Sequence, residues 1–152
     1  FLDVQTKIII NNKGTIDKYM GDCIMAFWNA PLDCKDHAEL AVKSALEVLD
    51  ATQKLNEELS PLNLPPINVG IGISTGECIV GNMGSEIRFD YSVIGDAVNL
   101  GARLEGQTRN YDGVDLLLSE RTYRLCPSRA FKEVDRIKVK GKEERVTIYT
   151  PL

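Results

Sequence analysis

Hydrophobic residues follow strand-like and helix-like spacings in turn along the chain, and this predicts interleaved strands and helices. Residues 15–20 and 23–28 are strand-like apolar runs on either side of Gly21-Asp22, which predicts a hairpin. Residues 67–81 alternate and are rich in Ile and Val, which predicts two strands around a turn at Thr75-Gly76. Further strands are expected at 89–94 and 114–118, and a closing hairpin at 131–139 and 145–149.

Helical spacing marks two longer segments. Residues 1–12 have apolar positions at 1, 4, 8 and 9, so we expect the end of a helix that stops near Gly14. Asp36 to Glu39 match a capping box, and a helix is expected to run from there to about residue 59. Prolines then break the chain into a loop. The expected apolar face of this helix consists of Ala38, Ala41, Ala45, Leu49, Thr52 and Leu55.

Two later helices are predicted from their capping residues. Asp96 is expected to cap a helix over 97–105, and Ser119 a short helix that stops before Pro127. The hairpins imply antiparallel pairing, and helices are interleaved with the strands. We therefore expect one α+β domain over residues 1–152, with a mixed or antiparallel sheet and helices packed on it.

Composition limits the range of partners. The chain has 152 residues, 43% of them hydrophobic, and a net charge of −4, which argues against nucleic acid because its binders usually carry a basic face. A local basic excess in 129–145 is open to two interpretations, a solvated strand face or a surface that meets phosphate. Four cysteines without CxxC spacing and a single histidine argue against zinc, and they favour a reducing, cytoplasmic compartment.

Asp22, at the tip of the first expected hairpin, is a candidate for chemistry. Gly-Asp suits a tight turn, which is one sufficient reason for its presence. A carboxylate there would also suit Mg²⁺, which takes one or two carboxylates together with substrate phosphates. Both interpretations stay open from the residues alone.

Asn99 and Arg103 are a second candidate, because residues four apart share one face of a helix. The pair is either a solvated polar face or an amide and a guanidinium placed for charge on a phosphoryl or sugar oxygen. Small neighbours would let another surface approach this helix: Ala97, Gly101 and Ala102.

Two other enzyme classes do not fit the spacing. The glycines of 70–76 read GxGxxxG and alternate within a strand pattern, whereas a dinucleotide-binding loop opens a helix. Glycines in strands more often allow the close approach of a helix or another backbone. His37 is the sole imidazole and lies in a helix-capping segment, and no Ser or Cys has a nucleophile context, which argues against a catalytic triad.

Three segments together carry a family resemblance. They are GTIDKYMGDCIMAFWNAP at 14–31, VGIGISTGECIVGNMGSEIRFDYSVIGDAVNLGARLEG at 69–106 and IKVKGKEERVTIY at 137–149. In turn they resemble the segment around the second metal-binding aspartate, the central strands with the following helix, and the closing hairpin of class III adenylate/guanylate cyclases. The resemblance covers nearly the whole chain in one order, and it implies the ferredoxin-like nucleotidyl cyclase fold.

The resemblance implies an adenylate cyclase that converts ATP to 3′,5′-cyclic AMP and pyrophosphate with two ions, Mg²⁺ or Mn²⁺, held by two aspartates. Asp22 matches the second metal aspartate. Asn99 matches the asparagine that orients the ribose, and Arg103 matches the arginine that stabilises charge in the transition state. Lys140 matches a lysine that contacts the triphosphate, with Lys142 as the alternative.

Lys18 and Ser92 match the two base-reading positions of the family. A lysine donates to adenine N1 and a hydroxyl accepts from the N6 amine, which favours ATP over GTP. The resemblance also implies head-to-tail homodimers, in which the metal aspartates come from one subunit and the helix with Asn99 and Arg103 comes from the other. An upstream sensory or regulatory domain is expected in the parent protein.

The N-terminal end departs from the family pattern. The first metal aspartate lies in a strand of the form F-x-D-[IV]-x-G-F-T, and Phe1-Leu2-Asp3-Val4 imitates only its start. The Gly-Phe-Thr is absent, and Asp3 is too near Asp22 for the long connecting helix. We therefore expect the first strand and its aspartate to be missing by truncation of an active parent, and the chain as given to be inactive or nearly so.

Two other interpretations remain. The first is a non-catalytic cyclase-like module that binds nucleotide or dimerises to regulate an attached domain. The second, a relative of diguanylate cyclases, is disfavoured because no Gly-Gly-Asp-Glu-Phe motif occurs.

Overall fold

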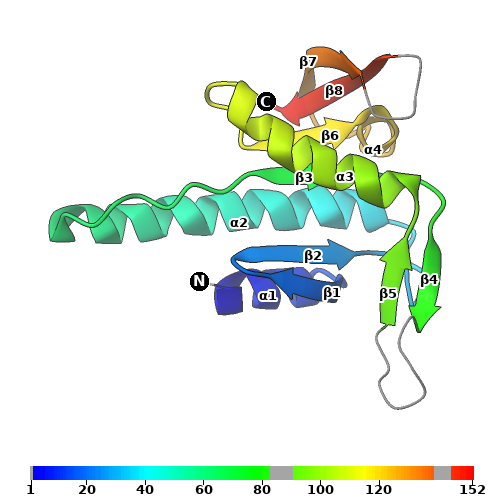
Figure 1. Ribbon diagram of the computed structural model, residues 1–152, viewed down its shortest axis with the longest axis horizontal. Coiled ribbons are helices and arrows are strands. Elements are labelled where there is room, and N and C mark those ends of the chain that lie inside the picture. Colours follow the sequence, from blue (N-terminus) through cyan, green and yellow to red (C-terminus); the bar gives the residue numbers. More distant parts are fainter. Residues whose placement is uncertain (1, 83–90, 139–144) are drawn as a thin grey trace.

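The structure is a computed structural model that describes residues 2–82, 91–138 and 145–152 (Figure 1). None of the helices in these ranges combines the length and apolarity needed to cross a bilayer. In chain order the elements are α1 (Leu2–Asn11), β1 (Thr15–Met20), β2 (Cys23–Phe27), α2 (His37–Leu59), η1 (Ser60–Leu62), β3 (Ile71–Ile73), β4 (Ile79–Asn82), β5 (Tyr91–Ile94), α3 (Asp96–Gln107), η2 (Thr108–Asn110), β6 (Leu116–Ser119), α4 (Glu120–Arg124), β7 (Phe131–Lys138) and β8 (Arg145–Pro151).

The strands of the described residues form three separate sheets. The largest has the order β3-β6-β8-β7, in which β3 and β6 are parallel and the other pairs are antiparallel. The hairpin of β1 and β2 forms a second sheet, and β4 pairs with β5 in a third. In Figure 1 the β4–β5 ribbon projects away from the large sheet at the end where α3 begins. The fold is therefore α+β, as the pattern predicts.

Strand β6 is the centre of the core because it is buried on both faces. Leu116 and Leu118 pack with Ala38, Val42 and Ala45 of α2. The intervening Leu117 packs with Leu104 of α3 and with Ile148 of β8. Alternate side chains of a strand point to opposite faces, so α2 covers one face of the sheet and α3 the other. Continuous apolar sequence is typical of such a doubly covered strand.

Several predicted elements are confirmed. The first hairpin begins at Thr15 and turns at Gly21-Asp22 as expected, and the first helix ends just before Gly14. The predicted face of α2 is buried at Ala38, Ala41, Ala45 and Thr52. Ser119 caps α4, since its Oγ accepts a hydrogen bond from the backbone N–H of Thr122.

The predicted capping box at the start of α2 is wrong. Asp36 precedes the helix, but its backbone angles are φ −92° and ψ 26°, and its side chain makes no capping hydrogen bond. Glu39, the other residue of the predicted capping box, forms an ion pair with Arg129 instead. Its Oε2 accepts a hydrogen bond from Nε of Arg129 at 2.9 Å, which ties α2 to the loop before β7. The tertiary ion pair has replaced the local cap.

Two other local predictions also need correction. Asp96 is the first residue of α3 and does not cap it, because Gly95, with φ of 154°, takes the cap position. The strand expected from residue 67 begins only at Ile71. Asn56 of α2 holds the preceding loop, since its amide donates to the carbonyl of Ile67 at 2.8 Å and accepts from the N–H of Ile67 at 2.7 Å. The backbone groups of Ile67 are thus committed to a helix side chain.

Glycines in β3 allow α3 to lie directly on the strand, as the sequence interpretation expects. A Cβ on Gly72 would collide with the carbonyl oxygen of Gly101 and the N–H of Glu105, and it would lie 2.9 Å from Cβ of Leu104. One turn further along, a Cβ on Gly70 would collide with Oγ1 of Thr108. At Gly72 the backbone of β3 therefore lies directly against the backbone of α3.

We predict that Gly72→Ala destabilises the chain, because the two atoms that the added methyl would meet first belong to the backbone of α3. The expected loss is about 2–3 kcal/mol in the free energy of unfolding, measured by denaturant titration. Gly106→Ala is the matched control. No atom lies within 4 Å of a Cβ there, and Ala is favoured over Gly in helices by about 0.5–1 kcal/mol. Equal effects of the two substitutions would contradict the close-packing account.

Candidate active site

The turn of the first hairpin presents Asp22 to a cleft. Gly21 has φ of 61°, a conformation that suits glycine and allows the tight turn between β1 and β2. Asp22 is exposed and lines a cleft of about 1340 Å³. Of the two interpretations of Asp22, the turn is thus confirmed, and the carboxylate is also free of the core and directed to open space.

The cleft separates two sheets. One wall is β2 with the loop to Ala30, and the other is β3 with the segments before and after it, from Ile67 to Cys78. The lining also includes residues of α3 and of α1, β4, β5 and the start of α2. Among the described residues, β2 pairs only with β1, and β3 pairs only with β6. Two strand edges therefore face one cleft.

Asn99 and Arg103 lie on the far side of α3 from this cleft. Both are exposed, and neither lines the cleft that Asp22 lines. The side of α3 that does line it consists of Ala97, Val98, Gly101, Ala102 and Glu105. One copy of the described chain therefore does not bring the predicted metal ligand and the predicted phosphate-facing pair together.

The small residues of α3 have contacts inside the chain. Gly101 places its carbonyl against Gly72 of β3, and Ala97 lies against Gly76, where a Cβ would come within 2.8 Å of the alanine Cβ. Only Ala102 of the three is exposed. The small size of Ala97 thus serves the packing of α3 on the segment after β3, and Gly101 contributes through its backbone carbonyl.

The predicted base-reading residues come from two strands that lie against each other. Lys18 is exposed on β1, opposite Met25 of β2. Ser92 lies in β5, opposite Gly81 of β4. β1 and β5 are in contact with each other. The predicted triphosphate contact Lys140 and its alternative Lys142 fall outside the described residues.

Cys23 lines the cleft close to two carboxylates. Burial raises the pKa of the Cys23 thiol above its usual value, and the carboxylates of Glu105 and Asp22 raise it further. Glu105 therefore approaches the hairpin from α3 across the cleft. Nothing in the sequence pattern pointed to Glu105, because its effect on Cys23 arises only when α3 packs on β3.

The described residues supply some, but not all, of the oxygen ligands that a two-ion site would need. No group of three or more His, Cys, Asp or Glu side chains that could hold a metal occurs within residues 2–82, 91–138 and 145–152. Asp3 lies in the first turn of helix α1, which agrees with setting it aside as a strand aspartate. Asp22 with phosphate oxygens of a substrate fits one ion. The described residues of one chain do not fit a pair of ions.

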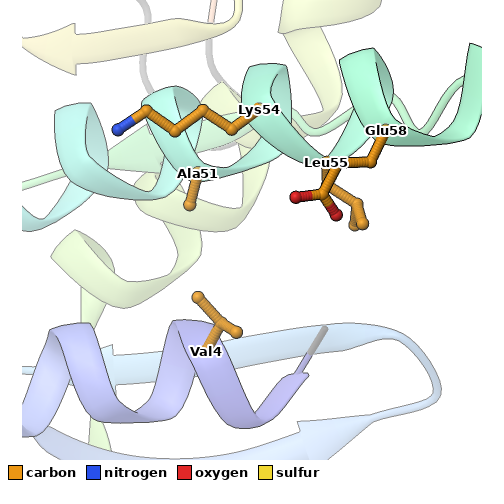
Figure 2. Close-up of a pocket in the computed structure, with 5 residues that line it drawn as sticks. All are labelled: Val4, Ala51, Lys54, Leu55 and Glu58. Atoms are coloured by element: carbon orange, nitrogen blue, oxygen red, sulfur yellow. The ribbon is translucent and has the colours of Figure 1, made fainter.

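A second hollow lies between α1 and α2 and carries no comparable chemistry. Figure 2 shows Val4 of α1 pointing toward Ala51 of α2, with Leu55 and Glu58 further along the same helix. Its volume is about 310 Å³. Lys54 at its edge is paired with Asp50 at 3.1 Å between Nζ and Oδ2. The large cleft is therefore the better candidate.

Comparison with known proteins identifies the family. A model of the adenylate and guanylate cyclase catalytic domain matches residues 7–150. The chain belongs to the adenylate and guanylate cyclase catalytic domain family. An adenylate cyclase of Anabaena cylindrica is 41% identical over 98% of this chain. The chain spans 30% of the length of that relative.

Solved cyclase structures confirm the fold. The adenylyl cyclase CyaB from P. aeruginosa superposes with a TM-score of 0.87 at 32% identity, over 99% of this chain and 78% of that one. The guanylyl cyclase Cya2 gives 0.83 at 34% identity, over 97% of this chain and 74% of that one. Cyclases named for either nucleotide thus share this architecture, so the choice of base depends on side chains.

We predict that Asp22→Asn makes Cys23 more reactive, because it removes one of the negative charges that raise the pKa of the thiol. Thiolate is the reactive form, so alkylation by iodoacetamide at pH 8 should be about two- to threefold faster. Peptide mapping by mass spectrometry measures the rate at Cys23. Asp50→Asn, the same charge change far along α2, is the control. An unchanged rate in Asp22→Asn would show that the Asp22 carboxylate does not act on the Cys23 thiol.

Proposed function

We propose that this domain, in its complete form, is an adenylate cyclase that converts ATP to 3′,5′-cyclic AMP and pyrophosphate. The ribose 3′-oxygen attacks the α-phosphorus and loses its proton, and the bond from the α-phosphorus to the bridging oxygen breaks as pyrophosphate leaves. The observation that carries the proposal is the division of the family's site residues over one chain. Asp22 lines the cleft, while Asn99 and Arg103 face outward from α3.

That division supports a site shared between two copies of the chain. In a head-to-tail homodimer, Asp22 of one subunit would face Asn99 and Arg103 of the other, and two equivalent sites would form. Asn99 would hold the ribose by hydrogen bonds through its amide. Arg103 would place its guanidinium against the phosphoryl oxygens as negative charge develops there.

Divalent metal would be held by Asp22 together with phosphate oxygens of ATP. Bound Mg²⁺ or Mn²⁺ supplies Lewis-acid activation of the 3′-hydroxyl and neutralises charge on the triphosphate. The contribution of Asp22 is to fix the position of that charge at the hairpin turn, which β1 and β2 hold rigidly. Lys140, matched from the family pattern, would contact the triphosphate from the closing hairpin.

The second carboxylate of a two-ion site would come from an additional strand. The cleft between β2 and β3 supports this proposal, because two strand edges face it and an extended segment between them would join the two sheets into one. CyaB and Cya2 both contain residues that have no counterpart here. The family's first strand, with its metal aspartate, is the proposed occupant, and the parent protein would also carry a regulatory domain.

ATP is the proposed substrate because Lys18 and Ser92 present the pattern that suits adenine. The ammonium of Lys18 donates to the unprotonated N1, and the hydroxyl of Ser92 accepts from the N6 amine. Guanine offers a carbonyl and a ring N–H in these places, which would leave the donors and acceptors mismatched. The contact between β1 and β5 supports a common base pocket.

One observation favours a second candidate, a non-catalytic module that binds nucleotide or dimerises. Asp22 is the single carboxylate that the described residues offer at the hairpin turn, and one carboxylate suits one ion better than two. Such a module would still bind ATP through Lys18 and Arg103, but would release no pyrophosphate.

We predict that the chain extended at its N-terminus by its natural upstream residues forms cyclic AMP from ATP with Mn²⁺ or Mg²⁺, measured by chromatography. The 152-residue chain should be inactive or nearly so. In the extended protein, Asp22→Ala and Arg103→Ala should each lower kcat by at least about 1,000-fold, because each removes transition-state charge stabilisation. Mixing the two variants should restore up to about a quarter of wild-type activity, since one site of each heterodimer is whole.

Arg136→Ala is the matched control for loss of an exposed arginine, and it should retain activity. Failure to recover activity on mixing would contradict the shared site even if each single variant is inactive. An extended wild-type protein that binds ATP but forms no cyclic nucleotide would favour the non-catalytic module instead.

We predict that Lys18→Glu combined with Ser92→Ala shifts substrate preference toward GTP. The acid accepts from the ring N–H of guanine and no longer donates to adenine N1, so the ratio of kcat/KM for ATP over GTP should fall by at least about tenfold. Lys43→Glu makes the same charge change on the exposed side of α2 and serves as the control. An unchanged ratio in the double variant would place the base pocket elsewhere.

A further inference from the structure

The carboxyl ends of β3 and β6 lie side by side because the two strands are parallel. Ile73 is opposite Leu118 at the ends of their pairing. The chain therefore leaves β3 through Thr75 at the same edge where Ser119 begins the turn into α4. Three hydroxyl side chains meet at this edge: Thr75, Ser119 and Thr122.

These hydroxyls form a continuous hydrogen-bonded chain. Oγ1 of Thr75 is 2.7 Å from Oγ1 of Thr122, which is in turn 2.9 Å from Oγ of Ser119. Ser119 Oγ also accepts the backbone N–H of Thr122 at 3.3 Å. Thr122 has 0% exposure and Ser119 6%. A buried hydroxyl left unpaired costs free energy, so the network holds Thr75 at a defined place.

The segment that follows Thr75 is packed against the start of α3. A Cβ on Gly76 would lie 2.8 Å from Cβ of Ala97. A Cβ on Gly95 would lie 3.1 Å from the carbonyl oxygen of Glu77 and 3.3 Å from Cα of Cys78. Gly95 and the first turn of α3 therefore pack directly against residues 76–78.

The backbone of Asn99 is hydrogen-bonded to Gly95, which packs on residues 76–78. The carbonyl of Gly95 accepts the N–H of Val98 at 3.1 Å and the N–H of Asn99 at 3.3 Å. A shift of residues 76–78 would move Gly95, and with it the carbonyl that orients the backbone of Asn99. Arg103 follows one turn later on the same face.

We propose that Thr75 and Thr122 are positioning residues for catalysis. Their hydroxyl pair locks the loop after β3 to the start of α4, and through residues 76–78 and Gly95 it sets the direction of the first turn of α3. Both act on the reaction through Asn99. This role rests on the proposed cyclase function, because Asn99 takes part in catalysis only if the domain is a cyclase.

Hydrogen exchange tests the physical link without any catalytic assay. In the 152-residue chain, Thr75→Val removes the hydroxyl at nearly constant volume, and the amides of Val98 and Asn99 should exchange about fivefold faster, as for one net hydrogen bond lost. Thr75→Ser keeps the hydroxyl and should exchange at the wild-type rate. Amides in the interior of α2 should be unchanged in all variants. Exchange at Val98 and Asn99 that stays at the wild-type rate in Thr75→Val would overturn the proposal.

Kinetics of the extended protein test the catalytic role. Thr75→Val and Thr122→Val should lower kcat about three- to tenfold with little change in KM, because misplaced catalytic groups lose rate and binding is retained. Thr75→Ser should restore kcat. Thr52→Val is the control, since it deletes a buried hydroxyl that bonds only within α2, to the carbonyl of Val48, and it should leave kcat unchanged.

A further comparison separates positioning from general destabilisation. If Thr75 acts through Asn99, then Thr75→Val should cause no additional loss of kcat in an Asn99→Ala background. Full additivity in that background, or a wild-type kcat in Thr75→Val, would overturn the positioning role. If the extended wild-type protein forms no cyclic AMP, the proposed function fails, and the exchange measurement alone decides whether the hydroxyl pair orients α3.

Discussion

The close contact between α3 and β3 is the constraint on which the rest of the structure depends. Gly72 lets the strand backbone lie directly against the carbonyl of Gly101 and the N–H of Glu105. At that separation Leu104 reaches Leu117 and closes one half of the core. Since a helix is rigid, pressing one side of α3 onto the sheet turns its opposite side, with Asn99 and Arg103, outward.

This arrangement has an electrostatic consequence. The hairpin presents Asp22 to a cleft that Glu105 of α3 also lines. Burial and these two carboxylates raise the pKa of the Cys23 thiol. The cationic Arg103 is kept on the other side of the helix, away from these carboxylates. Arg109 and Arg121 line the cleft together with these carboxylates, whereas Arg103 stays on the outer side of α3, where the proposed shared site would need it.

Local patterns predicted much of the fold and failed where distant groups compete. The hairpin of β1 and β2 and the buried face of α2 follow from short-range spacing. The cap at Asp36 failed because Glu39 pairs with Arg129, 90 positions away in the sequence. The strand at Ile67 failed because Asn56 takes the backbone groups that a neighbouring strand would use.

What the amino-acid sequence determined by itself is the identity and order of the family segments, and these suggested the residues proposed for the site, among them Asp22, Lys18, Asn99 and Arg103. Only the tertiary structure decided that Asn99 and Arg103 face away from the cleft that Asp22 lines. It also decided that Glu105 approaches Cys23. The contact between Thr75 and Thr122 is likewise a result of the tertiary structure. The reason is physical. Spacing along one helix or strand defines a face, but which face is buried depends on the partner that packs against it, and that partner is distant in sequence.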